Sequence, residues 1–93
     1  MSRKEENYSI HHILPKSRLG SGEKNNLIML KDTTHRAIHT LFQNQMIAEQ
    51  LITTVNINSK ALREDVKQWL LETLNSRDIG DPYEWYNPKA IRF

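Results

Sequence analysis

Residues 8–42 read YSIHHILPKSRLGSGEKNNLIMLKDTTHRAIHTLF, and all four histidines of the 93-residue chain fall within them. The stretch begins with β-prone residues from Tyr8, and Pro15 is typical of the end of such a strand. A second apolar run, at 27–30, predicts a second strand. The segment between them, 16–25, is rich in Gly, Ser, Lys and Asn, so we expect a flexible loop. The pattern predicts a β-hairpin with an enlarged tip.

The residues after the second strand predict a helix. Asp32, Thr33 and Thr34 are favourable N-cap residues. The helix that they begin carries His35 and His39, four residues apart. Because residues at this spacing share one face of a helix, both imidazoles could bind a single cation.

The adjacent pair His11 and His12 needs a different geometry. Successive side chains of an extended segment point to opposite sides, whereas at a bend they can contact two neighbouring atoms. One imidazole of the pair could therefore bind the same metal while the other reaches a water molecule. The front half of the chain thus contains one candidate metal site and one further imidazole.

The second half predicts helices. Residues 43–54 have a helical pattern, which leaves open whether they continue the first helix or form a second one, and the β-branched and Asn-rich 53–58 should interrupt it. Ser59 can cap a further helix over 60–75, whose apolar stripe we expect to be buried. The stripe consists of Leu62, Val66, Trp69, Leu70 and Leu74.

Length and composition limit the class of protein. A chain of 93 residues with 38% hydrophobic content supports one small domain, and a bound metal would help to stabilise its small core. Cysteine is absent, which excludes disulfides and thiolate zinc sites. No segment resembles a signal peptide or a membrane span, so we expect a soluble, cytoplasmic protein with no membrane partner.

The net charge of +2 is unevenly distributed. Residues 1–42 carry seven basic and four acidic side chains, whereas 43–93 carry six basic and seven acidic ones. Positive charge beside the histidines favours a phosphate backbone as partner. The basic side chains that could hold a phosphate are Arg3, Lys16, Arg18 and Arg36. We expect the phosphates of the substrate to run past Lys16, Arg18 and Arg36.

Three short segments form one pattern: HHILP at 11–15, NLIML at 26–30 and HRAIH at 35–39. With their strand, loop, strand and helix context, they resemble the HNH nuclease family, the ββα-metal or His-Me finger enzymes, in the four-histidine form of the colicin DNases. The match covers residues 8–42, and its five polar positions occur in the family's order. The rest of the chain receives no assignment from it.

The resemblance implies that one divalent metal ion (Mg, Mn, Ni or Zn) is bound by His11, His35 and His39. It also implies that His12 is the general base and that Asn26 holds the two arms of the motif together and helps to orient His12, although Asn25 could take that role. Many family members have Asp at the position of His11 and Cys pairs that bind a structural zinc. This chain has neither, so we expect the C-terminal helix to steady the hairpin instead.

The expected fold class is α+β, in a single domain over 1–93. A small ββα-metal hairpin-helix core at 8–42 is followed by C-terminal helices over 43–75, which we expect to pack on the core. An extended aromatic tail covers 76–93, and its aromatic side chains should pack over the helices rather than stack on bases.

The expected function is metal-dependent hydrolysis of DNA phosphodiester bonds. Histidine suits the general base because its unperturbed pKa of about 6.5 leaves it mostly neutral at pH 7. An RNase that uses the same site is one alternative, and a catalytically silent module that binds nucleic acid or protein is another. A homodimer or a protein partner stays open.

Overall fold

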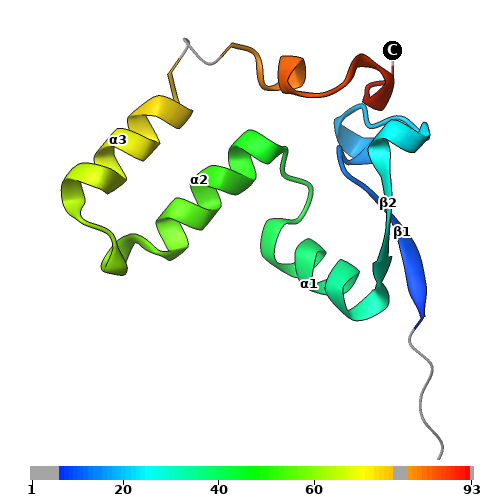
Figure 1. Cartoon of the computed structure of the whole chain (residues 1–93), viewed down its shortest axis with the longest axis horizontal. Coiled ribbons are helices and arrows are strands. Elements are labelled where there is room, and N and C mark those ends of the chain that lie inside the picture. Colours follow the sequence, from blue (N-terminus) through cyan, green and yellow to red (C-terminus); the bar gives the residue numbers. More distant parts are fainter. Residues whose placement is uncertain (1–6, 77–79, 93) are drawn as a thin grey trace, which may run out of the picture.

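The computed structural model describes residues 7–76 and 80–92 (Figure 1). Strands β1 (Tyr8–His12) and β2 (Leu27–Lys31) pair antiparallel in a two-stranded sheet. In this sheet Tyr8 pairs with Lys31, and the pairs continue in order to His12 with Leu27. The hairpin predicted from the sequence is therefore present, although β1 ends before Pro15.

Helix α1 (Asp32–Phe42) follows β2 without a loop and contacts both strands. Its N-cap is Lys31, and the three predicted capping residues, 32–34, form the first helical turn instead. Asp32 still favours this end, because a carboxylate interacts well with the positive end of the helix dipole. The helix ends at Phe42, because the φ of 52° at the following Gln43 is incompatible with continued α-helix.

The segment between the strands was predicted to be a flexible loop, but the structure contains two 3₁₀ turns there, Lys16–Arg18 and Lys24–Asn26. Between these turns the backbone doubles back closely on itself. A Cβ atom at Gly20 would lie 1.8 Å from the carbonyl oxygen of Leu14. Position 20 therefore requires glycine, because a side chain there would overlap backbone atoms.

Helices α2 (Ile47–Ile57) and α3 (Glu64–Leu74) form a helical hairpin and contact each other. Two predictions were wrong here. Helix α2 continues through the β-branched segment that should have interrupted it, and the packing of buried Val55 outweighs the low helix propensity of that segment. Ser59 begins a 3₁₀ turn rather than a helix, and the N-cap of α3 is Arg63. In the described part of the chain, no helix has the length and apolar character that a membrane span requires.

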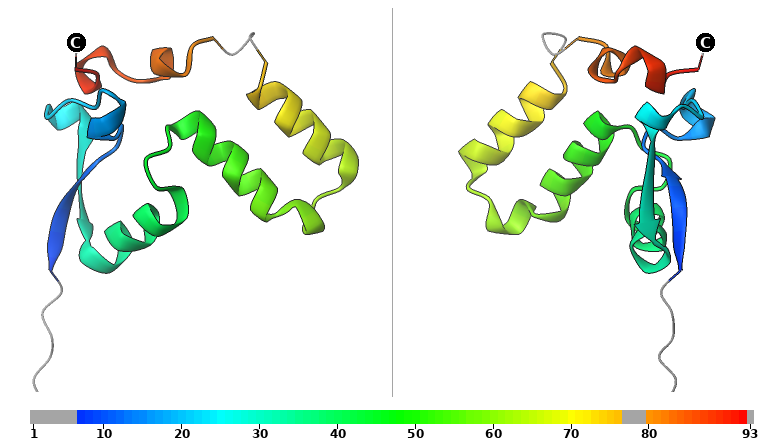
Figure 2. Two further views of the ribbon diagram at one scale, coloured as in Figure 1. Left: turned by 180° about the vertical axis from the view of Figure 1, so that it is seen from behind. Right: turned by 45° about the vertical axis from the view of Figure 1, so that its right-hand side comes forward.

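Helix α3 lies against α2 and away from the hairpin (Figure 2). Its apolar stripe is not buried as the spacing predicted. Trp69 is 63% exposed, and the other members of the stripe are only half-buried. The prediction that the C-terminal helices pack on the ββα core is thus wrong for α3, because α2 is its main packing partner.

The buried core lies where the C-terminal tail crosses the junction between the hairpin and α2 (Figure 1). Its members are Leu14, Met46, Tyr86 and Ala90. The hydroxyl of Tyr86 accepts a hydrogen bond from the N–H of Ile47, at the start of α2. The N–H of Ser21 donates to the carbonyl of Ala90. The tail, and not the C-terminal helix, therefore braces the loop of the hairpin.

The tail itself is less extended than predicted. It contains two 3₁₀ turns, Pro82–Trp85 and Pro88–Ala90, and Ile91 forms an isolated β-bridge with Gly20. Residues 77–79 and 93 of the predicted tail lie outside the described residues.

Candidate metal centre

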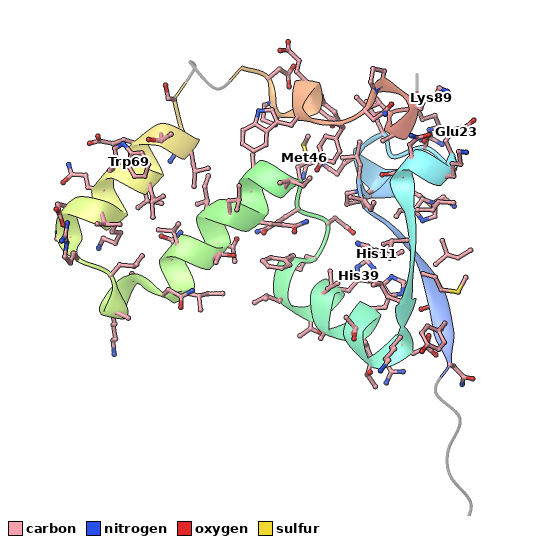
Figure 3. All side chains as sticks on the ribbon, in the orientation of Figure 1. His11, Glu23, His39, Met46, Trp69 and Lys89 are labelled. Atoms are coloured by element: carbon pink, nitrogen blue, oxygen red, sulfur yellow. The ribbon has the colours of Figure 1, made fainter. Side chains whose placement is uncertain are left out.

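The side chains of His11, His35 and His39 meet between β1 and α1, and Figure 3 shows His11 and His39 side by side there. One nitrogen atom from each ring lies within 4.8 Å of the other two. The ring centroids are 4.7 to 5.4 Å apart. We call these three residues the histidine cluster. They are the side chains that the resemblance implied as metal ligands.

A serine on β1 holds one member of the cluster in place. The hydroxyl oxygen of Ser9 lies 2.7 Å from Nδ1 of His35. Ser9 and His11 are two residues apart on a strand, so both side chains point to the face that α1 covers. Sequence reasoning missed Ser9, although the alternation of the strand could have placed it beside the cluster.

The spacing of the nitrogen atoms fits a divalent cation. Nε2 of His39 lies 2.9 Å from Nε2 of His35. Nitrogen ligands about 2.0–2.1 Å from a tetrahedral ion lie about 3.3 Å from one another, so small side-chain rotations would suffice. Among the described residues, Nδ1 of His11 is a buried ring nitrogen without a hydrogen-bond partner.

The electrostatic environment favours the neutral form of His11. Burial lowers the pKa of His11, and the neighbouring His35, His39 and His12 lower it further. A neutral imidazole keeps the lone pair that metal binding requires. The donor set therefore fits a divalent metal ion at neutral pH.

His12 lies beside the cluster on an open cleft of about 360 Å³, which Lys16, His35 and His39 also line. Burial lowers the pKa of His12, and the charges of Lys16 and His35 lower it further. At neutral pH this ring is therefore a neutral proton acceptor. It faces the same cleft as two members of the histidine cluster.

Asn26 is fully buried and joins the two arms of the motif. Its Oδ1 accepts from the N–H of Leu14 at 2.6 Å, and its Nδ2 donates to the carbonyls of Leu14 and Ser21, each at 2.9 Å. Asn25 is exposed. These described hydrogen bonds of the Asn26 amide reach the backbone of Leu14 and Ser21, so the predicted contact through which the amide would orient His12 is not among them.

Two of the predicted phosphate-binding side chains flank the cluster. Lys16 lines the cleft of His12, and Arg36 lines a second cleft of about 280 Å³. His35 and His39 line both clefts, so the cluster can be approached from two sides. Both basic side chains belong to exposed residues.

The third predicted phosphate-binding side chain, Arg18, forms its contacts at the start of α2. Its guanidinium donates to the carboxylate of Glu49 at 2.8 Å and to the carbonyl of Asn44 at 3.1 Å. The N–H of Met46 also donates to Glu49. This hydrogen bond and then Arg18 lower the pKa of Glu49, against the opposing effect of burial. Arg18 therefore ties the hairpin loop to the start of α2. Arg3 lies outside the described residues.

Comparison of the chain with protein-family models, with curated proteins and with solved structures gave no match. Function is therefore inferred from the site itself. Its elements are the histidine cluster, the neighbouring His12 and the two flanking basic side chains.

Proposed function

We propose that this protein is a metal-dependent endonuclease of the HNH type, which hydrolyses phosphodiester bonds of DNA. The observation that carries the proposal is the position of His12 on a cleft that His35 and His39, two members of the histidine cluster, also line. Three protein ligands leave open coordination positions, as in catalytic rather than structural metal sites. An open metal site beside a proton acceptor suits hydrolysis.

In this proposal, His11, His35 and His39 hold one divalent cation. Their spacing, the unpartnered nitrogen of His11 and the lowered pKa of that residue support the assignment. When bound, the cation supplies positive charge that stabilises the phosphate transition state and the departing 3′ oxygen. Neutral imidazole ligands leave this charge undiminished.

His12 is the general base, which takes a proton from the attacking water molecule. Its lowered pKa supports this role, because the ring must be neutral to accept a proton. A general base commonly contributes about 10²–10⁴-fold to a rate. Cleavage should therefore decline as the pH falls through the pKa of His12, which lies below the usual 6.5.

Lys16 and Arg36 bind the phosphates of the substrate on either side of the scissile bond. Both are exposed and line the two clefts at the cluster. Arg18 contributes less to binding in this proposal, because its guanidinium is held by Glu49. Charge reversal at Lys16 or Arg36 should weaken DNA binding and flatten its dependence on salt.

A cleavage assay tests the proposal. Purified protein is incubated with supercoiled plasmid and, separately, with RNA in the presence of Mg, Mn, Ni or Zn, with EDTA as a control. We expect plasmid cleavage that requires metal and stops with EDTA. The His12→Ala variant, purified in the same way, controls for contaminating nucleases, and Asn25→Ala at an exposed position is its matched control.

The same assay separates the alternatives. Cleavage of RNA with plasmid left intact would indicate an RNase, and such cleavage could occur even without metal, since the 2′-hydroxyl allows a cyclising reaction that DNA cannot undergo. Metal binding without cleavage of either substrate would indicate a silent binding module. Either result would contradict the proposed DNA endonuclease.

A further inference from the structure

The second half of the chain projects from the first as a thin arm, consisting of α2, α3 and their connection (residues 47–74) (Figure 2). The Cα atoms extend over 51 × 40 Å but only 16 Å in the third direction. The radius of gyration is 16.1 Å, whereas a compact chain of this length has about 12 Å. The two helices of the arm therefore lie in a single layer.

A single layer cannot bury its apolar side chains on both faces, and stable domains are built from at least two packed layers. In the arm, Leu51 is 43% exposed, Ile57 is 60% exposed and Trp69 is 63% exposed. No described residue of α3 is buried. The arm thus has exposed apolar side chains that a second layer could bury, among them Trp69 on α3 (Figure 3).

The charge of the arm argues against a nucleic acid as the occupant. Helix α2 carries a single charged side chain, Glu49, which is paired with Arg18. The whole of 47–74 contains three basic and four acidic side chains. A near-neutral, slightly acidic surface does not attract phosphates, but two copies of it would not repel each other.

The exposed area is sufficient for a dimer. The chain exposes 7330 Å², whereas a compact monomer of its mass, 11.0 kDa, exposes about 5,600 Å². The excess, which belongs to the chain as a whole, is about 1,700 Å², roughly twice the 800 Å² or so that each partner buries in a standard interface.

From these observations we propose that a second copy of this chain packs on the arm. The layer formed by α2 and α3 of one copy then packs on the same layer of the other, around a two-fold axis. A homodimer of this kind is self-complementary, and each copy supplies the second layer that the other lacks. This proposal does not depend on the nuclease proposal. The histidine clusters lie outside the arm, so dimer formation requires no metal.

The test is the molar mass of the full chain in solution, measured by light scattering from dilute to concentrated samples in EDTA. We expect twice the chain mass of 11.0 kDa. Combined Ile57→Glu and Trp69→Glu substitutions should halve the mass, because charged side chains would be buried in the interface. Met29→Glu is the matched control, because Met29 is 61% exposed on the hairpin, outside the arm.

A wild type that stays at the mass of one chain at all concentrations would overturn the proposal. So would a dimer that survives the arm substitutions but dissociates in Met29→Glu, since it would then form through the hairpin.

Circular dichroism must show that the variants are folded. If the arm variant unfolds, the Trp85→Phe variant is used instead, because Trp69 is then the single tryptophan of the chain and its fluorescence can be followed. Its emission should shift to the blue as the protein concentration rises, and an unchanged emission would contradict the dimer.

Discussion

The hydroxyl of Ser9 on β1 lies 2.7 Å from Nδ1 of His35 on α1, so a strand residue fixes the orientation of an imidazole on the neighbouring helix. If Nδ1 of His35 donates to this hydroxyl, Nε2 keeps its lone pair and points to the histidine cluster. Groups that orient metal ligands in this way strengthen metal binding.

The first prediction concerns this contact. Ser9→Ala should reduce the affinity for divalent metal by about 10–100-fold, as expected for the loss of a group that orients a ligand. The measurement is calorimetric titration of the metal, with the melting temperature of the metal-free protein as a check on folding. Ser17→Ala, in the cleft of His12, is the control and should bind metal normally. Equal affinities of the wild type and Ser9→Ala would show that the contact has no such role.

The second prediction concerns the two glycines of the hairpin loop. Gly20→Ala should destabilise the fold by about 1–3 kcal/mol or more, because its Cβ would overlap the carbonyl of Leu14. Gly22→Ala should change the stability by no more than about 0.5 kcal/mol, since a Cβ there meets no atom within 4 Å. Urea unfolding of both variants measures the difference. Similar stabilities would contradict the tight packing of the loop.

The third prediction concerns the buried amide of Asn26. Asn26→Ala leaves an N–H and two carbonyls without their partner, and each such group costs about 1–3 kcal/mol when it stays buried. A small domain has little stability to lose, so we expect a largely unfolded protein by circular dichroism. Asn25→Ala, at the exposed neighbouring position, should remain folded. A folded and stable Asn26→Ala would mean that the amide is not what joins the two arms.

The fourth prediction concerns pH. The folded state lowers the pKa of Glu49 below its ordinary 4.5, so the contribution of Glu49 to stability is present above that value and is lost as the pH falls through the lowered pKa. Glu49→Gln should therefore be less stable than the wild type at neutral pH, and its stability should fall less on acidification. Melting temperatures over a pH series measure both curves. Parallel curves would exclude a contribution of Glu49 to acid unfolding.

Local patterns predicted the hairpin and α1, because strand and helix periodicities over 8–42 are strong and the two elements are adjacent in sequence. The spacing of His35 and His39, together with the strand pair, was enough to bring the predicted ligands to one place. Contacts within a short stretch of chain are the ones that periodicity can reveal.

Contacts between distant segments could not be predicted in this way. Helix α1 ends because Gln43 adopts a positive φ, which the residue type does not predict. Helix α2 continues through its β-branched segment because Val55 is buried. The hydrogen bond from Ser21 to Ala90 and the core contact of Leu14 with Tyr86 both join positions more than sixty residues apart. The engagement of Arg18 by Glu49 is likewise visible only once the chain is folded.

The central claim is that His11, His35 and His39 bind the metal while His12 acts on the water molecule. Loss of a ligand and loss of the base should therefore have different effects. His39→Ala should lower the metal affinity and the metal-induced rise in melting temperature, and its activity should be partly recovered at high metal concentration.

The most direct test measures the metal affinity and the rate of plasmid cleavage of His12→Ala side by side with the wild type. We expect nearly unchanged metal binding and a rate reduced by about 10²–10⁴-fold, the usual contribution of a general base. Cleavage by metal-loaded His12→Ala at the rate of the wild type would contradict the account and would make the adjacent His11 the candidate base.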